Sequence, residues 1–387
     1  MSNKKIFSSN FKLGILGGGQ LGKMLLQDCI RYDIYSKVMD SNKEAPCQGI
    51  CNEFIVGNLT KYEDVVSFCH DVDVVTVEME NVNTYALEFL EKNGKKVIPS
   101  SKILRINQDK SKQKDFYIQH ELPTSNYKNY GNLSAVIKDY DEGKVSLPIV
   151  WKSAKFGYDG KGVKIIHSFD ELQNLSDVPC LLEEKVKIKK EISVIVARNQ
   201  SKEEKCFPAV EMEFNDHSNL VEFIMCPANI SKELEEKAFD TALKTAKSFN
   251  IVGLLAVELF ITEDNEILIN EVAPRPHNSG HHTIECCLTS QFDQHIRSVL
   301  NLPLGNTSLK SPGIMVNLIG ENEFEGNVKY ENIEKILEIP GVSVHFYGKK
   351  KSRLNRKMGH VTIVHKDINK AKKIGKKVKK LIKVTSE

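Results

Sequence analysis

The sequence predicts a multidomain protein that combines an α/β part with an α+β part. In the first hundred residues, predicted strands alternate with helices, which is typical of a doubly wound parallel sheet. From residue 149 to 213, strand-like apolar runs follow one another, which favours a mostly antiparallel sheet. A segment over 302–312 rich in Pro, Gly, Asn and Ser predicts a linker before a further small α/β unit. A chain of 387 residues is long enough for such an arrangement.

The N-terminal domain is expected to begin with a strand over 12–16, a glycine turn over 17–22 and a helix. The apolar residues of that helix recur at helical spacing: Leu21, Met24, Leu25 and Cys29. A second strand ends at Asp40, and 72–77 is a buried strand. This order predicts a Rossmann-like unit.

The glycine turn Gly17–Gly22 fits G-x-G-x-x-G between a strand and a helix, and Asp40 ends the next strand. That is the dinucleotide fingerprint in its expected context, so an NAD-dependent dehydrogenase is one interpretation of this segment. The physics supports a weaker statement, because backbone N–H groups at a helix N-terminus bind some anion. On this segment alone both interpretations stay open.

The middle of the chain is expected to hold strands at 149–152 and 165–166, then at 180–184, 191–196 and 208–213. A helix is predicted over 231–249, with Ser231 as N-cap and Glu233 in the first turn. The basic glycine turn Lys155–Gly162 lies between the first two strands. It suits a triphosphate, since ammonium groups act as point charges on phosphates, but Asp-Gly is also a common hairpin tip.

Two apolar runs around Asp264-Asn265 predict a hairpin that places Glu258 across from Glu271. Facing carboxylates repel each other. A hard cation such as Mg²⁺ bound between them would make the net interaction attractive. On the repulsion alone, Glu271→Gln is expected to leave the ligand-free fold as stable as before or slightly more so. The alternative is a surface hairpin with two tolerated glutamates.

A loop over 273–282 with Arg, His, Asn and Ser leaves the end of this hairpin. The order Glu258, Asn270-Glu271, Arg275 resembles the metal-binding core of the ATP-grasp ligases. The run over 270–281 resembles the N5-carboxyaminoimidazole ribonucleotide synthetase branch of purine biosynthesis. Segments 17–24, 77–82, 347–349 and 356–360 fit the same branch, so the resemblance covers about residues 12–365.

This resemblance implies an ATP-grasp fold with an N-terminal Rossmann-like domain over 1–104 and a small C-terminal domain over 309–387. Between them lies the ATP-grasp domain over 105–308, with a glycine-rich lid at about 120–190 and a metal-binding core at about 191–308. The implied reaction is the carboxylation of 5-aminoimidazole ribonucleotide (AIR) by ATP and bicarbonate through carboxyphosphate, in de novo purine biosynthesis.

The resemblance also assigns site residues. For ATP they are Lys110, Lys152, Gly157, Tyr158, Asp159, Gly160, Lys161, Gly162, Val163, Glu183, Glu184, Lys185, Val186, Glu191, Asn270 and Glu271. For the ribonucleotide and bicarbonate they are Gln20, Leu21, Glu80, Tyr158, Asp159, Arg275, His277, Asn278, Ser279, Lys349 and Arg356. Catalytic roles fall to Arg275, Asp159 and Lys161, and Glu258 with Glu271 would hold Mg²⁺, expected as two ions.

One departure and several alternatives accompany this assignment. Phe214 stands where the family usually has a nucleotide-contacting His. A formate-dependent glycinamide ribonucleotide transformylase would have similar parts, and an inactive ATP-binding scaffold would keep the fold alone. Zinc on His277, His281 and His282 is less favoured than Mg²⁺ chemistry.

Composition limits the partners. The net charge of +3 predicts no strong field toward nucleic acid, and no apolar run approaches the roughly 18 residues of a membrane span. The nine cysteines lack metal-ligand spacing, and the N-terminus lacks a secretory signal, so we expect a cytoplasmic protein with reduced thiols. Small molecules and a second copy in a homodimer are the expected partners. A lysine-rich helix over 368–384 is expected to pack on the last domain. The apolar face of this helix carries Ile368, Ala371, Ile374, Val378 and Leu381.

Overall fold

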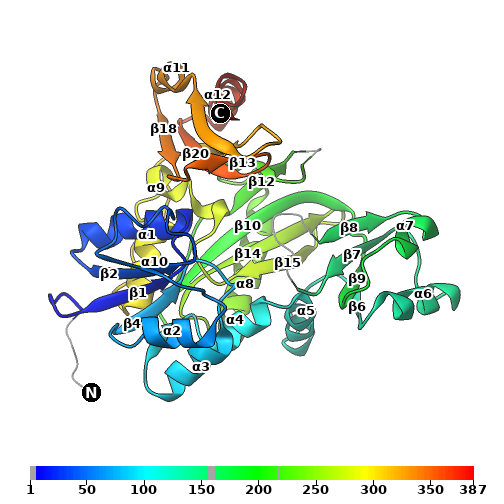
Figure 1. Ribbon diagram of the computed structural model, residues 1–387. Coiled ribbons are helices and arrows are strands. Elements are labelled where there is room, and N and C mark those ends of the chain that lie inside the picture. Colours follow the sequence, from blue (N-terminus) through cyan, green and yellow to red (C-terminus); the bar gives the residue numbers. More distant parts are fainter. Residues whose placement is uncertain (1–5, 156–161, 216–217) are drawn as a thin grey trace.

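The computed structural model describes residues 6–155, 162–215 and 218–387 (Figure 1). Its N-terminal domain is a five-stranded parallel sheet of order β3-β2-β1-β4-β5, which confirms the doubly wound prediction. The strands are β1 (Lys12–Leu16), β2 (Tyr35–Asp40), β3 (Glu53–Val56), β4 (Val74–Val77) and β5 (Lys96–Ile98). The helices are α1 (Gln20–Arg31), α2 (Tyr62–Phe68), α3 (Thr84–Lys92) and α4 (Ser101–Asn107).

Helix α5 (Lys110–Gln119) leads into a four-stranded antiparallel sheet of order β6-β9-β7-β8, which lies at the right of Figure 1. Its strands are β6 (Tyr127–Tyr130), β7 (Ile149–Ser153), β8 (Val163–Ile166) and β9 (Cys180–Glu184). Helices α6 (Leu133–Asp141) and α7 (Phe169–Gln173) belong to the same unit, whose buried apolar side chains form a small core of their own. We call this unit the lid.

A nine-stranded sheet forms the centre of the molecule, in the order β15-β14-β10-β12-β13-β16-β20-β18, with β11 on β10. Its strands are β10 (Ile188–Arg198), β11 (Glu204–Cys206), β12 (Val210–Phe214), β13 (Val221–Cys226), β14 (Gly253–Thr262), β15 (Ile267–Ala273), β16 (Gly313–Ile319), β18 (Val342–Phe346) and β20 (Lys357–Val364). Because β13 pairs with β16, the sheet crosses the boundary expected near residue 309 without a break.

Helices cover this sheet. Helix α8 (Lys232–Ser248) buries Ala238, Ala242 and Ala246 against it, and the Ser231 side chain accepts the N–H of Leu234, as the predicted N-cap requires. After β15 come the short helices η1 (Asn278–Gly280) and α9 (Thr283–Cys286) and then α10 (Gln291–Val299). None of the helices within the described ranges is long and apolar enough to cross a membrane.

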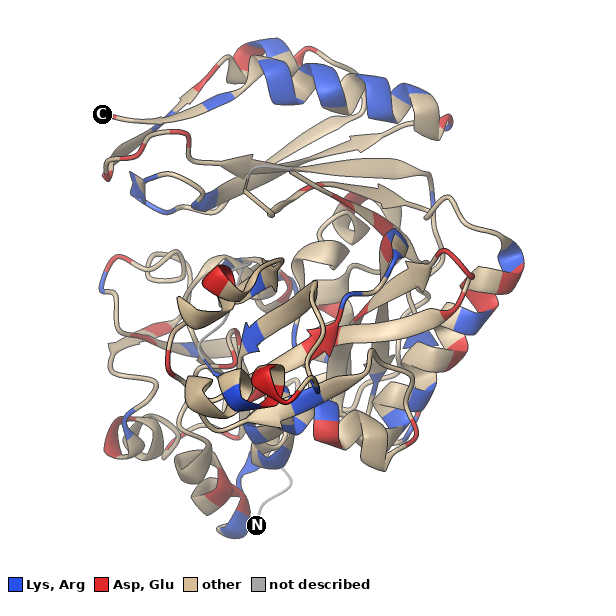
Figure 2. Ribbon diagram, turned by 90° about the vertical axis from the view of Figure 1, so that its right-hand side faces the viewer, with Lys and Arg blue, Asp and Glu red and all other residues tan. Residues whose placement is uncertain are grey.

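The C-terminal region adds a three-stranded sheet of order β19-β17-β21, with α11 and α12 beside it. Its elements are β17 (Gly326–Glu331), α11 (Ile333–Leu337), β19 (Lys351–Ser352), α12 (Ile368–Leu381) and β21 (Lys383–Ser386). The apolar face predicted for the tail helix packs in the core below it. Most lysines of this helix, blue at the top of Figure 2, are exposed. The predicted extension of the helix to residue 384 is wrong, because 383–386 pairs with β17.

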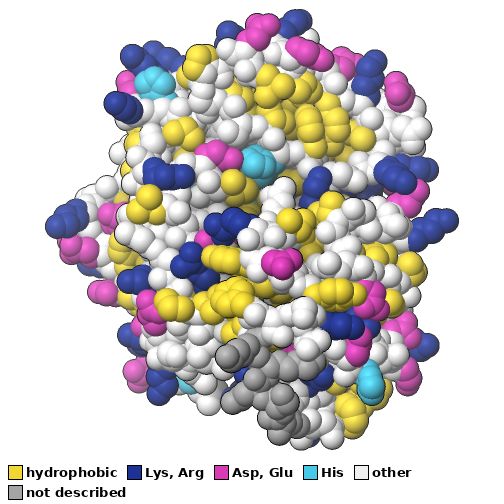
Figure 3. Space-filling view, turned by 90° about the vertical axis from the view of Figure 1, so that its left-hand side faces the viewer, with side chains coloured by type: hydrophobic (Ala, Val, Ile, Leu, Met, Phe, Trp, Pro, Cys, Tyr) yellow, Lys and Arg dark blue, Asp and Glu magenta, His cyan; other side chains and the backbone are white. Residues whose placement is uncertain are grey.

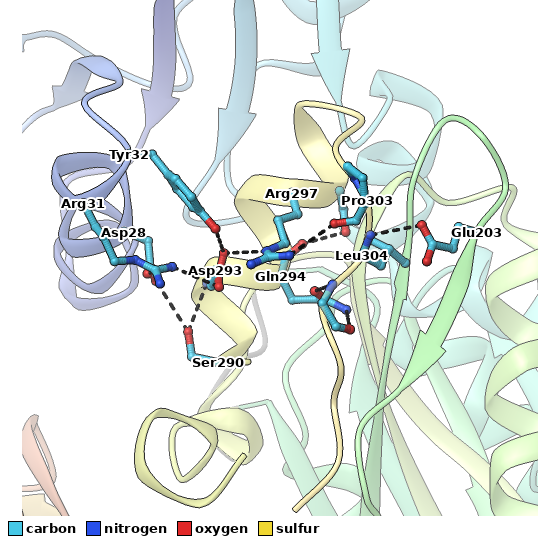
Figure 4. Close-up of polar contacts among 12 residues, drawn as sticks. Asp28, Arg31, Tyr32, Glu203, Ser290, Asp293, Gln294, Arg297, Pro303 and Leu304 are labelled. Carbon is cyan, nitrogen blue, oxygen red and sulfur yellow. Dashed lines mark hydrogen bonds and ion pairs between the residues drawn. The ribbon is translucent and has the colours of Figure 1, made fainter. Parts of the chain in front are cut away.

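The N-terminal domain contacts α10 through an ion pair and a hydrogen bond from the end of α1 (Figure 4). Asp293 of α10 accepts the Tyr32 hydroxyl at 2.7 Å and pairs with Arg31 at 2.9 Å. Arg297, one turn along α10, contacts the same carboxylate at 2.9 Å. These contacts and the apolar side chains packed around them fix the two domains that form opposite walls of the cleft described next.

Candidate active site

One large cleft, of about 1260 Å³, lies where the N-terminal domain, the central sheet and the C-terminal region meet. The described residues that line it include many of those singled out from the sequence. They are Gln20, Leu21, Glu80, Lys110, Glu258, Glu271, Arg275, His277, Asn278, Ser279, Lys349 and Arg356. Segments separated by more than three hundred positions along the chain therefore share one cavity.

The predicted carboxylate hairpin is present. Strands β14 and β15 pair antiparallel with Glu258 opposite Glu271, and Asn265 in the turn has a φ of 60°, which suits Asn. Burial and the charge of Glu271 raise the pKa of Glu258. The His277 ring lies 3.5 Å from the Glu258 carboxyl group, so a polar group from the following loop also faces the pair.

Lys110 changes the electrostatics of this pair. Its ammonium donates to Glu271 Oε2 at 2.6 Å, and the positive charge of Lys110 lowers the pKa of Glu271. Glu271 is therefore already compensated in the ligand-free protein. The expectation that Glu271→Gln relieves repulsion without cost needs revision, because the change would leave Lys110 without its carboxylate. We expect the substitution Glu258→Gln, and not Glu271→Gln, to relieve the repulsion between the two carboxyl groups.

The loop after β15 brings Arg275 against the N-terminal domain. Its guanidinium pairs with Glu80 at 2.8 Å and also donates to the Pro276 carbonyl at 2.9 Å. Farther along, Ser279 lies within 2.9 Å of both the His277 ring and the Ser193 hydroxyl. The loop is thus anchored to the sheet, and the Arg275 guanidinium lies at the junction of two domains.

The glycine turn before α1 is already occupied by carboxyl groups of the protein. Gly18 N–H donates to Asp40 at 2.8 Å, and Leu21 N–H donates to Glu78 at 3.1 Å. Glu78 is buried, and burial raises its pKa. Two N–H groups that the sequence assigned to an anionic ligand therefore have internal partners. Sequence reasoning missed Glu78, although its place directly after β4 is a signal for a site residue.

The C-terminal region supplies the cations predicted for a phosphate. Lys349 and Arg356 both line the cleft; Lys349 donates to the Lys357 carbonyl at 2.7 Å, and Arg356 donates to the Lys351 carbonyl at 2.8 Å. Sequence reasoning missed that Lys350, Lys351, Arg353 and Lys357 line the same wall. Lys350 also reaches Glu44 of the N-terminal domain at 2.9 Å, so the two walls touch at this end.

Other predicted nucleotide residues are not part of the cleft lining. Lys152 donates to Asn270 at 3.1 Å and pairs with Glu183 at 2.9 Å. Burial raises the pKa of Glu191, on β10 of the central sheet, to about 7. Glu184 accepts the Asn126 amide at 2.9 Å at the edge of the lid. Lys152 therefore joins lid strand β9, which carries Glu183, to β15, which carries Asn270.

The remaining predicted residues make none of these contacts. Phe214, at the position of the expected His, lines the cleft. Gly162 accepts the Ser153 N–H at 2.9 Å, and Val163 begins β8. Lys185 and Val186 follow β9 directly. The proposed Gly157, Tyr158, Asp159, Gly160 and Lys161 lie outside the described residues.

Three segments of the chain match known domain families. Residues 115–292 match an ATP-grasp domain, residues 11–108 a ribonucleotide synthetase preATP-grasp domain, and residues 313–374 a phosphoribosylaminoimidazole carboxylase C-terminal domain. These matches confirm the fold class predicted from the sequence.

Full-length relatives agree. The chain is 38% identical over 372 residues to the N5-carboxyaminoimidazole ribonucleotide synthase of Bacillus subtilis, covering 94% of this chain and 93% of that protein. It is 39% identical over 361 residues to the chloroplastic phosphoribosylaminoimidazole carboxylase of Vigna aconitifolia, covering 91% of this chain but 64% of that longer protein.

Solved structures are similar over almost the whole chain. N5-carboxyaminoimidazole ribonucleotide synthetase from Thermotoga maritima superposes with a TM-score of 0.89 at 39% identity, covering 97% of this chain and all of that one. The Aspergillus clavatus N5-carboxyaminoimidazole synthase in complex with ADP and AIR superposes with a TM-score of 0.86 at 31% identity, covering 96% of this chain and 98% of that one.

Proposed function

The chain belongs to the N5-carboxyaminoimidazole ribonucleotide synthetase family of ATP-grasp ligases, and on that premise we propose that it carboxylates AIR with ATP and bicarbonate. The observation that carries the proposal is the shared cleft: the carboxylate pair on β14 and β15, the Arg275 loop and the cationic wall with Lys349 all face it. A nucleotide, a small anion and a ribonucleotide phosphate would each find matching groups there.

The proposed reaction has two steps. The γ-phosphoryl group of ATP passes to bicarbonate, which gives carboxyphosphate and ADP. The exocyclic amine of AIR then forms the new C–N bond, directly or through CO₂ held in the cleft, while phosphate leaves and the amine loses a proton. Arg275 is the proposed group for holding carboxyphosphate, since a guanidinium matches carboxylate and phosphate oxygens. Asp159 and Lys161 keep their proposed catalytic roles by resemblance.

Glu258 and Glu271 fit Mg²⁺. Among the described residues, no three His, Cys, Asp or Glu side chains lie close enough together to hold a metal ion by themselves. Two carboxylates completed by phosphate oxygens are nevertheless a usual arrangement for this ion. Lys110 supplies the compensating charge at Glu271 in the ligand-free protein, and bound Mg²⁺ would neutralise charge on the phosphates.

The two ends of the cleft suggest which substrate binds where. Lys110, Lys152 and Asn270 cluster by the hairpin, which supports binding of the triphosphate there. Lys349 and Arg356 lie on the C-terminal wall, which supports binding of the AIR phosphate there. Arg275, paired with Glu80, lies at the junction of hairpin loop and N-terminal domain and suits the reacting carbonate.

The deciding experiment measures ADP release with each acceptor. We expect turnover that requires both AIR and bicarbonate. Turnover with glycinamide ribonucleotide and formate would favour the transformylase alternative. ATP binding without turnover on any acceptor would favour an inactive scaffold, and NADH oxidation without ATP would return the dehydrogenase interpretation.

We also propose a homodimer. Strand β18 forms one edge of the nine-stranded sheet, and its side chains are only partly buried. Figure 3 views the molecule from the left-hand side of Figure 1, where β18 lies, and shows apolar side chains gathered on the upper, C-terminal part of the surface. An exposed edge strand with apolar side chains is a template for pairing with another chain. Sedimentation of the purified protein would test this proposal.

A further inference from the structure

Lys114 is a buried lysine that neither the sequence nor the resemblance assigned to the site. It lies on α5, its side chain is 3% exposed, and its ion-pair partner Glu183 is 4% exposed. We infer that Lys114 is a positioning residue for ATP, which holds the Glu183 carboxylate so that Lys152 remains directed toward the phosphates. The inference rests on the proposed function, since it names a further residue of the same nucleotide site.

The contacts of Lys114 are specific and complete. Its ammonium donates to Thr124 Oγ1 at 2.6 Å and to Ser125 Oγ at 2.8 Å, and it lies 3.2 Å from Glu183 Oε2. The Ser125 hydroxyl in turn donates to the same carboxylate oxygen at 2.7 Å. The ammonium therefore has an oxygen partner for each of its three N–H groups.

Glu183 connects Lys114 to the proposed nucleotide lysine. Its other oxygen, Oε1, lies 2.9 Å from the Lys152 ammonium, and Lys152 also donates to Asn270, which precedes the proposed metal ligand Glu271. Burial raises the pKa of Glu183, but the charges of Lys152 and Lys114 outweigh that effect and lower it. Glu183 is thus an ionised carboxylate shared between two ammonium groups.

This sharing sets the charge that ATP meets. Burial lowers the pKa of Lys114 to about 8, so its ammonium stays mostly charged at pH 7. Two lysines around one carboxylate then leave one net positive charge, which attracts a triphosphate. Without Lys114, Glu183 would have Lys152 as its remaining charged partner among these groups, the net charge would fall to zero, and Lys152 would be drawn toward Glu183. A buried charge that loses one partner strengthens its hold on the other, because the low dielectric leaves it little solvation.

The position of Lys114 also joins three parts of the fold. Thr124 and Ser125 belong to the segment between α5 and the first lid strand, and Glu183 lies on lid strand β9. The Thr124 hydroxyl donates to the Ile269 carbonyl of β15 at 2.8 Å. Lys114 therefore links the lid to the strand that carries Asn270 and Glu271.

The test uses the full chain and compares Lys114→Met with Lys138→Met, a lysine on lid helix α6 whose side chain is 74% exposed. Losing a hydrogen-bonded charge is expected to weaken binding about tenfold. We therefore expect Lys114→Met to raise KM for ATP and the calorimetric Kd for Mg-ADP about tenfold, with KM for AIR and bicarbonate within about twofold. Lys138→Met should match the wild type.

Ser125→Ala removes the hydroxyl that bonds both charged groups and is the milder variant. It should raise the same two nucleotide constants a few-fold, and it carries the test if Lys114→Met does not fold. Unchanged nucleotide constants in the folded variants, or an equal rise in the constants of all substrates, would overturn the inference. Mg-ADP binding needs no acceptor, so failure of wild-type AIR carboxylation would count against the proposed function and not against this inference.

Discussion

Replacing the two facing glutamates one at a time should shift stability in opposite directions. Glu258→Gln removes a carboxyl group whose pKa is raised by burial and by Glu271. Glu271→Gln removes a carboxylate whose pKa is lowered by Lys110, which it contacts at 2.6 Å. Both variants keep the side-chain shape, so differences in packing are small and the electrostatic term decides the sign.

The sign follows from proton linkage. Because the folded pKa of Glu258 is raised, the unfolded chain loses this proton first, and the wild type loses stability as pH rises from about 4.5. With about 1.4 kcal/mol for each pKa unit, we expect Glu258→Gln to gain about 1–3 kcal/mol at pH 7 or above. Glu271 contributes stability above about pH 4.5 that is lost only in strong acid. Its side chain is 43% exposed to the cleft, so solvent screening limits the expected loss in Glu271→Gln to about 1 kcal/mol.

Thermal unfolding without ligand, from pH 5 to pH 8, measures both effects. Glu258→Gln should unfold at a higher temperature than the wild type, by a margin that grows with pH, and Glu271→Gln at a lower one at pH 7. Adding Mg²⁺ and ATP should stabilise the wild type by about 2.7 kcal/mol at a hundredfold excess over Kd, and either variant much less. Shifts of the same sign in both variants without ligand would refute the electrostatic argument, and a full ATP shift in Glu271→Gln would refute the metal assignment.

Three further changes test other parts of the cleft. Arg356→Ala should raise KM for AIR by about one to two orders of magnitude, because hydrogen bonds to charged groups contribute about 1.5–3 kcal/mol, and leave KM for ATP within a few-fold; initial rates against each substrate will show whether ATP responds instead. Glu191→Gln should raise the unfolding temperature at pH 8 more than at pH 5, because the raised pKa of about 7 makes ionisation costly only at higher pH; an equal shift at both values would contradict this. Phe214→His should lower the Kd for Mg-ADP a few-fold in calorimetry, and an unchanged value would mean that aromatic packing suffices.

The parts of the site that the sequence predicted are those with local signals. The Asp264-Asn265 turn predicts the hairpin of β14 and β15, and the expected facing pair of Glu258 and Glu271 is confirmed. The register beside the turn alone would place Glu258 opposite Asn270, and an irregularity between Glu258 and Leu259 shifts it to Glu271. The ion-pair partner of Glu271 could not be predicted, because Lys110 lies 161 positions away on a helix with no pattern that points to the hairpin. The Lys114–Glu183 pair was missed for the same reason.

The boundary of the last domain shows a related limit. The Pro- and Gly-rich segment over 302–312 suggests an independent unit, and composition is the only local evidence available there. Strand pairing is a long-range property, and β13 with β16 joins the two units in one sheet. Lys349 and Arg356 are consequently carried on a continuation of the sheet that holds Glu258, which keeps the proposed phosphate site in a fixed relation to the hairpin.

The N-terminal glycines illustrate how one pattern serves two chemistries. In a dinucleotide site they admit the pyrophosphate to the helix N-terminus, and an acidic residue after the second strand takes the ribose hydroxyls. Here Asp40 turns to the Gly18 N–H instead, and a Cβ added at Gly19 would lie 2.5 Å from a Glu78 oxygen. A side chain at position 19 would therefore displace the Glu78 carboxyl group from the position that it has here. Since Glu78 lies 57 positions beyond Leu21, whose N–H it accepts, no local pattern could separate a dinucleotide turn from this one. The physical distinction is whether the acceptor for the helix N-terminal N–H groups belongs to a ligand or, as with Glu78, to the chain itself.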